Sequence, residues 1–152
     1  MSINLSDTTP TAPAGTTNVH WQQDASGNVS ANAALPAFTW GFYAPGTYTA
    51  NQLIVAYTFT RAVTFPANWG AGGSNPPSGK VDVNPTGSAV LTVKKNGITT
   101  VGTATISTSG VYTFATSGGT TVSFVNGDDI EVYAPASADA TLAGARFTIQ
   151  GQ

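Results

Sequence analysis

The sequence predicts an all-β protein: an antiparallel β-sandwich or jelly roll with an extended N-terminal arm. Three observations support this fold class. Apolar residues recur with a period of two, turn-forming residues separate these runs about every 8–12 residues, and no window shows the 3.6-residue apolar period of an amphipathic helix. Hydrophobic residues make up 41% of the 152 residues, which is enough to build the core of one domain.

Residues 1–37 form the predicted arm. Its run Thr8–Gly15 is rich in Pro, Thr and Ala, a composition that favours an extended path with little to bury. A short island, Val19, His20 and Trp21, follows. Because Trp is enriched at interface hot spots, Val19 and Trp21 are candidate anchors on a neighbouring subunit. The alternative is that the arm folds back and Trp21 packs against its own domain.

Residues 38–152 form the predicted domain. Leu53–Thr60 has large apolar residues at its odd positions, as expected of a strand with one buried face. Two further β-prone runs, Ala89–Lys95 and Ile98–Ile106, flank Asn96-Gly97. Asn-Gly between such runs predicts a hairpin, because both residues accept the positive φ angles of a type I′ turn.

Shorter runs complete the domain: Val111–Phe114, Thr121–Phe124, Ile130–Tyr133 and Ala145–Gln150. Turn residues at 117–119 and 126–128 predict two more hairpins among the first three runs. In the last run, Phe and Ile point to one side and Arg, Thr and Gln to the other. The predicted core consists of Phe38, Trp40, Leu53, Val55, Tyr57, Phe59, Leu91, Val93, Phe114, Val122, Phe124, Ile130, Val132, Phe147 and Ile149.

A Gly/Pro-rich stretch, Asn68–Pro85, interrupts the strands. A loop this long in a compact domain is usually either a functional surface or disordered. Trp69 lies at its edge and has two interpretations. It either packs inside its own domain or contacts a partner.

Charged residues make up only 8% of the chain, against roughly 25% in an average soluble protein. Five basic residues do not supply a phosphate-binding surface, and the pair Lys94-Lys95 before the hairpin turn is a weak nucleic-acid signal. Cysteine is absent and histidine occurs once. We therefore expect no enzyme activity, no metal, no cofactor and no nucleic-acid partner.

The one concentration of carboxylates is Asp128, Asp129 and Glu131. Several oxygens together could hold calcium, but the ligand spacing of a calcium loop is missing, and turn formation already explains Asn126–Asp128. Glycoside cleavage needs two acids facing one cleft. The other candidate acids lie in separate turns: Asp24, Asp82 and Asp139.

The sequence also predicts no membrane association. Met1–Asp7 has neither the basic nor the apolar region of a signal peptide, and the longest apolar stretches are far shorter than the roughly 18 residues of a membrane span. The protein is therefore expected to stay in the cytoplasm where it is made until something other than secretion releases it.

Two stretches resemble bacteriophage proteins. Thr9–Ala31 resembles N-terminal leader segments of virion proteins of tailed phages. The second part resembles small jelly-roll modules of phage and prophage structural proteins in four segments: Phe59–Asn68, Lys95–Gly97, Asn126–Asp128 and Ala134–Leu142. Together the two stretches cover most of the chain.

A single module with an arm is most similar to capsid decoration (cement) proteins. This resemblance implies a non-enzymatic protein that binds the major capsid protein through its arm and the base of its sandwich. It would assemble in the host cytoplasm and reside on the outer surface of the capsid, as a homo-oligomer for which a trimer is favoured. The alternative is a tail-fibre or receptor-binding module that holds host glycan with Trp69 and the 68–85 loop. A carbohydrate-acting enzyme of jelly-roll fold is the third hypothesis.

Overall fold

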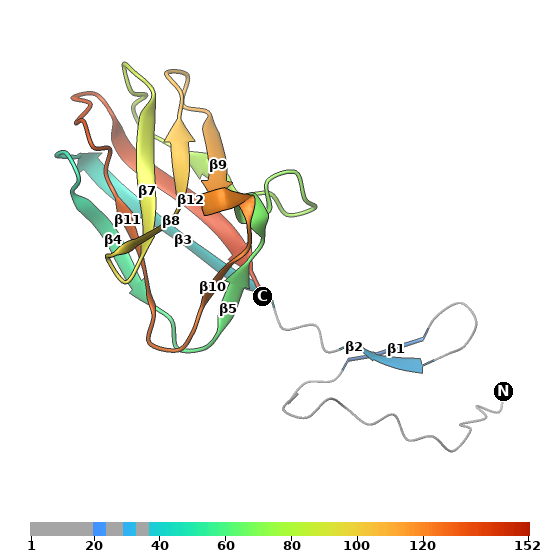
Figure 1. Cartoon of the computed structure of the whole chain (residues 1–152). Helices are drawn as coiled ribbons and strands as arrows, with labels where there is room; N and C mark the ends of the chain where they lie inside the picture. Colours follow the sequence, from blue (N-terminus) through green and yellow to red (C-terminus); the bar gives the residue numbers. More distant parts are fainter. Residues whose placement is uncertain (1–19, 24–28, 33–36) are drawn as a thin grey trace. The chain divides into compact units, whose positions relative to one another are not determined.

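The computed structural model describes residues 20–23, 29–32 and 37–152 (Figure 1). The chain divides into two compact units, residues 1–36 and 37–152. In the first unit, β1 (His20–Gln23) pairs antiparallel with β2 (Val29–Asn32). Part of the predicted arm is therefore a strand pair, and residues 1–19, 24–28 and 33–36 of the arm lie outside the described residues.

The second unit is all-β with antiparallel pairing, as the sequence predicts. Its strands are β3 (Phe38–Thr47), β4 (Leu53–Thr58), β5 (Val63–Phe65), β6 (Ser78–Lys80), β7 (Ala89–Lys95), β8 (Thr99–Ile106), β9 (Tyr112–Thr116), β10 (Val122–Phe124), β11 (Asp129–Tyr133) and β12 (Ala143–Gly151). Two short 3₁₀ turns, η1 (Ala67–Gly70) and η2 (Ser117–Gly119), lie between strands.

The strands of the second unit form a five-stranded sheet in the order β4-β11-β7-β8-β9, a three-stranded sheet in the order β3-β12-β6, and the pair β5–β10. Figure 1 shows β3 and β12 crossing behind β7 and β8. The pairs β3–β12, β4–β11 and β5–β10 are nested along the chain around the β7–β8 pair. The outermost pair places Phe38 opposite Gly151.

The hairpin predicted at Asn96-Gly97 is confirmed. It joins β7 to β8, and both turn residues have positive φ angles, 53° for Asn96 and 69° for Gly97. The Ile98 N–H donates to the Lys95 carbonyl oxygen at 3.2 Å, which closes the turn.

The other two predicted hairpins are wrong. β9 pairs with β8, β10 pairs with β5, and β11 lies between β4 and β7. The physical reason is burial, because Phe124 and Val122 are buried opposite Val63 and Phe65 rather than beside β9. The turn residues change the direction of the chain, and packing in the core determines which strand each new strand pairs with.

The stretch 68–85 is also not one continuous loop. β6 lies within it and pairs with β12, and Val83 forms an isolated bridge with Ala143. Gly79, in the centre of β6, lies against the ring of Tyr112, where an added Cβ would be 2.7 Å from the ring carbons. A glycine inside a strand commonly marks such a close approach.

One aromatic-rich core joins the sheets. The rings of Phe114 in β9 and Phe147 in β12 meet at a centroid distance of 5.5 Å. Most of the predicted core residues are buried, and Phe38 and Val55 are partly buried. The prediction is wrong for Leu53 and Tyr57, which are 47% and 37% exposed. Both lie on β4, an edge strand of its sheet, and a register shift occurs where Leu53 pairs with β11.

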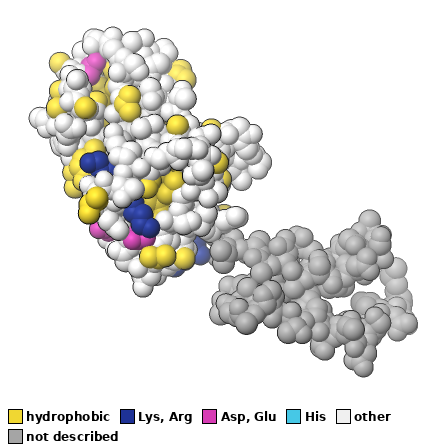
Figure 2. All heavy atoms as spheres, in the orientation of Figure 1, with side chains coloured by type: hydrophobic (Ala, Val, Ile, Leu, Met, Phe, Trp, Pro, Cys, Tyr) yellow, Lys and Arg dark blue, Asp and Glu magenta, His cyan; other side chains and the backbone are white. Residues whose placement is uncertain are grey.

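The surface reflects the low charge of the sequence. Figure 2 shows a face on which few side chains are charged, and several of these basic and acidic side chains lie near its lower end. Charged side chains therefore act in small local groups on this domain.

Candidate functional site

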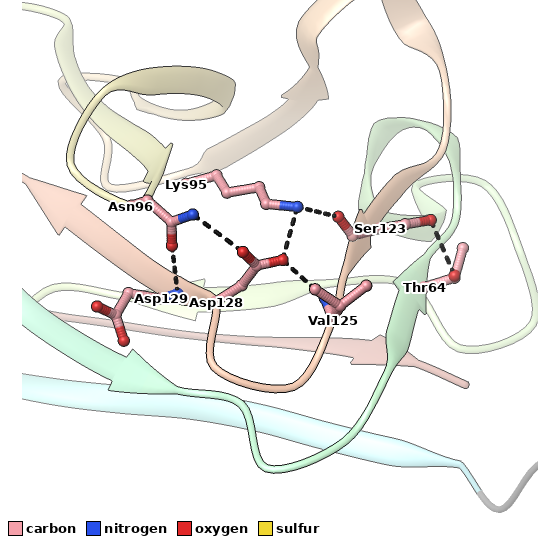
Figure 3. A network of polar contacts seen from close by, with 7 residues as sticks. All are labelled: Thr64, Lys95, Asn96, Ser123, Val125, Asp128 and Asp129. Carbon is pink, nitrogen blue, oxygen red and sulfur yellow. Dashed lines mark hydrogen bonds and ion pairs between the residues drawn. The ribbon is translucent and has the colours of Figure 1, made fainter.

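Of the acidic residues at 128–131, Asp128 connects two turns through its carboxylate (Figure 3). The Asp128 carboxylate forms an ion pair with the Lys95 ammonium at 2.7 Å and accepts hydrogen bonds from the Val125 N–H at 2.7 Å and the Asn96 side-chain amide at 2.9 Å. Lys95 also donates to the Ser123 carbonyl oxygen at 3.0 Å. The network connects the β7–β8 turn to the β10–β11 turn.

These contacts hold Asp128 in its charged form. The hydrogen bond from Lys95, followed by those from Val125 and Asn96, lowers the pKa of Asp128 to about 2. A carboxylate that accepts several donors is stabilised when ionised. Its oxygens are already used by neighbours, so the geometry supports the turn interpretation of this acid.

The other two acids have their own partners. The Asp129 carboxylate accepts a hydrogen bond from the Thr58 hydroxyl, and Glu131 accepts one from the Tyr133 hydroxyl. Within the described part of the chain, no three acidic or histidine side chains are grouped as a metal ion would require.

Trp69 lies in the core, with 1% of its surface exposed. Its indole N–H donates to the Ala115 carbonyl oxygen at 3.0 Å, and its ring packs on Gly102, where an added Cβ would lie 2.7 Å from the ring. Asn68 and Trp69 have φ angles of 50° and 58°, which are uncommon for residues other than glycine. The geometry thus supports the intrachain interpretation of Trp69, and we propose no partner role for it.

The remaining predicted anchors lie in the first unit. Val19 is outside the described residues. His20 and Trp21 belong to β1, where their backbones pair with Asn32 and Ala31 of β2. Their role in binding a partner stays a prediction.

A pocket that the sequence did not predict lies on the three-stranded sheet. It has a volume of about 220 Å³ and is lined by β6 and β12, with Phe42 of β3. Arg146 and Thr148 of β12 pair with Lys80 and Ser78 of β6, so these four side chains share one face of the sheet. They face away from the core, since Tyr112 packs against Gly79 on the other side.

A charged cluster borders this pocket. Asp82 accepts a hydrogen bond from the Tyr43 hydroxyl and forms an ion pair with Arg146, both at 2.7 Å. These two contacts, that of Tyr43 first, lower the pKa of Asp82, and the same bond raises the pKa of Tyr43. The Arg146 guanidinium lies 5.3 Å from the centre of the Tyr43 ring, which is 54% exposed.

Because Gly144 has no side chain, the Asp82 carboxylate can lie directly against it. It lies at the register shift in β12 with a φ angle of 65°, and an added Cβ would be 2.0 Å from the Asp82 carboxylate oxygen. The Asp82 N–H donates to the Ala143 carbonyl oxygen at 2.9 Å. The backbone of β12 therefore positions the acid beside Arg146.

Part of this site could be found in the sequence. The alternation of the last strand predicts that Arg146 and Thr148 share one face, as they do. The sequence did not predict Lys80 and Ser78 as site residues, because they lie in a stretch whose Gly and Pro residues are typical of a loop.

Comparison with protein-family models, with curated proteins and with solved structures finds no match for this chain. Within the described ranges, no helix has the length and apolar character needed to cross a bilayer.

Proposed function

We propose that this chain is a non-enzymatic capsid decoration protein of a tailed phage, built from a jelly-roll sandwich and an N-terminal arm. It binds the major capsid protein on the outer surface of the capsid and stabilises contacts between subunits. The arm residues Val19, His20 and Trp21 contact a neighbouring subunit, and the protein acts as a homo-oligomer, with a trimer favoured. The sequence resemblance and the topology of the second unit support this proposal.

The nested strand order is the observation that carries the proposal. A jelly roll contains two Greek keys, in which three consecutive strands are followed by one that returns beside the first. The order β11-β7-β8-β9 resembles this form, with β10, which pairs with β5, lying between β9 and β11 in the chain. The nested pairs β3–β12, β4–β11 and β5–β10 are those of one long hairpin rolled into two layers. This nesting supports the jelly-roll module that the resemblance implies.

One end of the domain suits a contact with the capsid. Ile98 is 86% exposed in the β7–β8 turn, and Val125 is exposed in the β10–β11 loop. The Asp128 network fixes both loops, so binding a partner there would order few residues. Burying apolar side chains favours association, and prior order lowers its entropic cost.

The test compares phage particles with and without the protein. We expect particles that lack it to release DNA at a lower temperature and under milder osmotic shock. The double variant Ile98→Ser with Val125→Ser should bind capsids less than the control Val111→Ser, which changes an exposed valine in the β8–β9 turn. Particles that lack the protein and resist heat like the wild type would contradict the capsid role.

The pocket beside Arg146 favours a second candidate function, a receptor-binding module that recognises host glycan. Its lining residues Ser78 and Lys80 come from the 68–85 stretch, as this alternative expects, although Trp69 does not take part. Under this alternative, an excess of purified protein blocks adsorption of phage to the host. The protein would then be present in few copies on the tail instead of many on the capsid.

A further inference from the structure

The pocket on the three-stranded sheet combines two cations that the fold places directly opposite each other. Arg146 of β12 and Lys80 of β6 are cross-strand partners on one face. Like charges in this position are unfavourable. Asp82 neutralises Arg146, while no hydrogen bond or ion pair from the Lys80 ammonium to a described residue is present. The pocket therefore has an excess positive charge that an anion would neutralise.

The rest of the pocket is suited to hydroxyl groups. Ser78 and Thr148 are also cross-strand partners, two residues along from the cations on the same face. Each hydroxyl can donate and accept a hydrogen bond. The exposed Tyr43 ring stands at the border of the pocket, held by its bond to Asp82. A ligand here meets positive charge at one end and neutral hydrogen-bonding groups at the other.

We propose that this pocket binds a carboxylated sugar unit, with its carboxylate between Lys80 and Arg146 and its hydroxyls at Ser78 and Thr148. Pockets for drug-sized ligands measure about 300–1,000 Å³. The volume here is about 220 Å³, which suits a single sugar ring. A carboxylate from a protein side chain would use the two cations alone, whereas a sugar acid also offers hydroxyls to Ser78 and Thr148, so the sugar acid is favoured.

This inference rests on the receptor-binding alternative, to which it gives a class of ligand, and is independent of capsid binding. The full-length protein, labelled with ¹⁵N, is titrated with sodium galacturonate and with galactose while NMR shifts are followed. We expect galacturonate, and not galactose, to shift amides of β6 and β12. Added salt should weaken the binding, because both cations are near the surface.

Three variants define the site. Lys80→Gln should weaken galacturonate binding about tenfold, since a charged hydrogen bond is lost. Lys94→Gln removes the same charge from β7, in the other sheet, and should leave binding unchanged. Asp82→Asn frees the Arg146 guanidinium from its competing carboxylate and should strengthen binding severalfold. A residue pair with only a structural role would not give a gain of affinity.

Several results would overturn the assignment. These are equal binding of galactose and galacturonate, an equal loss in Lys80→Gln and Lys94→Gln, or no gain in Asp82→Asn. Binding of a glutamate-rich peptide at β6 and β12 without binding of galacturonate would overturn the sugar assignment as well. If galacturonate binds as expected but excess protein does not block adsorption, the receptor role fails and the pocket assignment stands.

Discussion

Two small groups of charged side chains on this domain differ in how completely they are paired. In the first, the Asp128 carboxylate has three donors, and Lys95 reaches both this acid and a carbonyl oxygen. In the second, Asp82 pairs with Arg146 and Tyr43, while Lys80 opposite has no such contact to a described residue. The complete pairing of Asp128 supports a structural role, and the position of Lys80 beside a pocket is the basis of the proposed binding site.

The largest loss of stability is expected for a substitution in the core. Trp69→Ala removes a buried ring and its hydrogen bond to Ala115. We expect a loss of about 3–5 kcal/mol in the free energy of unfolding, measured by urea denaturation. A loss below that seen for surface variants would contradict the buried position of Trp69.

The next largest loss of stability is expected for a substitution beside Asp82. Gly144→Ala places a Cβ where Asp82 lies and forces a non-glycine residue to a φ angle of 65°. A left-handed conformation costs a non-glycine residue about 1–3 kcal/mol. The free energy of unfolding should fall by about this amount, and the contact between Asp82 and Arg146 should be lost. Gly87→Ala is the control, because an added Cβ there meets no neighbouring atom.

The stability that the Asp128 network contributes should depend on pH. The pKa of Asp128 falls from 3.8 to about 2 on folding, so the folded state binds this proton less readily than the unfolded state. The stability that it contributes is complete above pH 3.8 and is lost as the pH falls toward 2. Unfolding followed by circular dichroism across this range should show a shallower pH dependence in Asp128→Asn than in the wild type. Identical profiles would mean that the network does not stabilise the fold.

The smallest effect on stability is expected for Lys80→Gln. Because Lys80 faces Arg146 and is exposed, its replacement should change the free energy of unfolding by no more than about 0.5 kcal/mol, and in the stabilising direction. The matched change Lys95→Gln should be clearly destabilising, since it removes the partner of Asp128. Urea denaturation of the two variants side by side measures the contrast, and equal losses would remove the distinction between the two groups.

Local chemistry predicted several features of this fold correctly. The Asn96-Gly97 turn was predictable because positive φ angles are a local preference of these two residues, and the alternation of β12 places Phe147 in the core and Arg146 on the opposite face. The pairing of β10 with β5 could not be predicted, because it depends on packing between segments that are distant in the chain. The same holds for the pocket, since Lys80 meets Arg146 only after β6 pairs with β12.

The adjacency of Phe38 and Gly151 in the outermost strand pair has a practical consequence. A short linker could join the ends of the domain, and the chain could be opened instead at the exposed Gly118-Gly119 turn. Such a circular permutant would keep every strand pair of the domain while moving its chain ends to the Gly118-Gly119 turn. Fused cargo could then be displayed at either place without rebuilding the core.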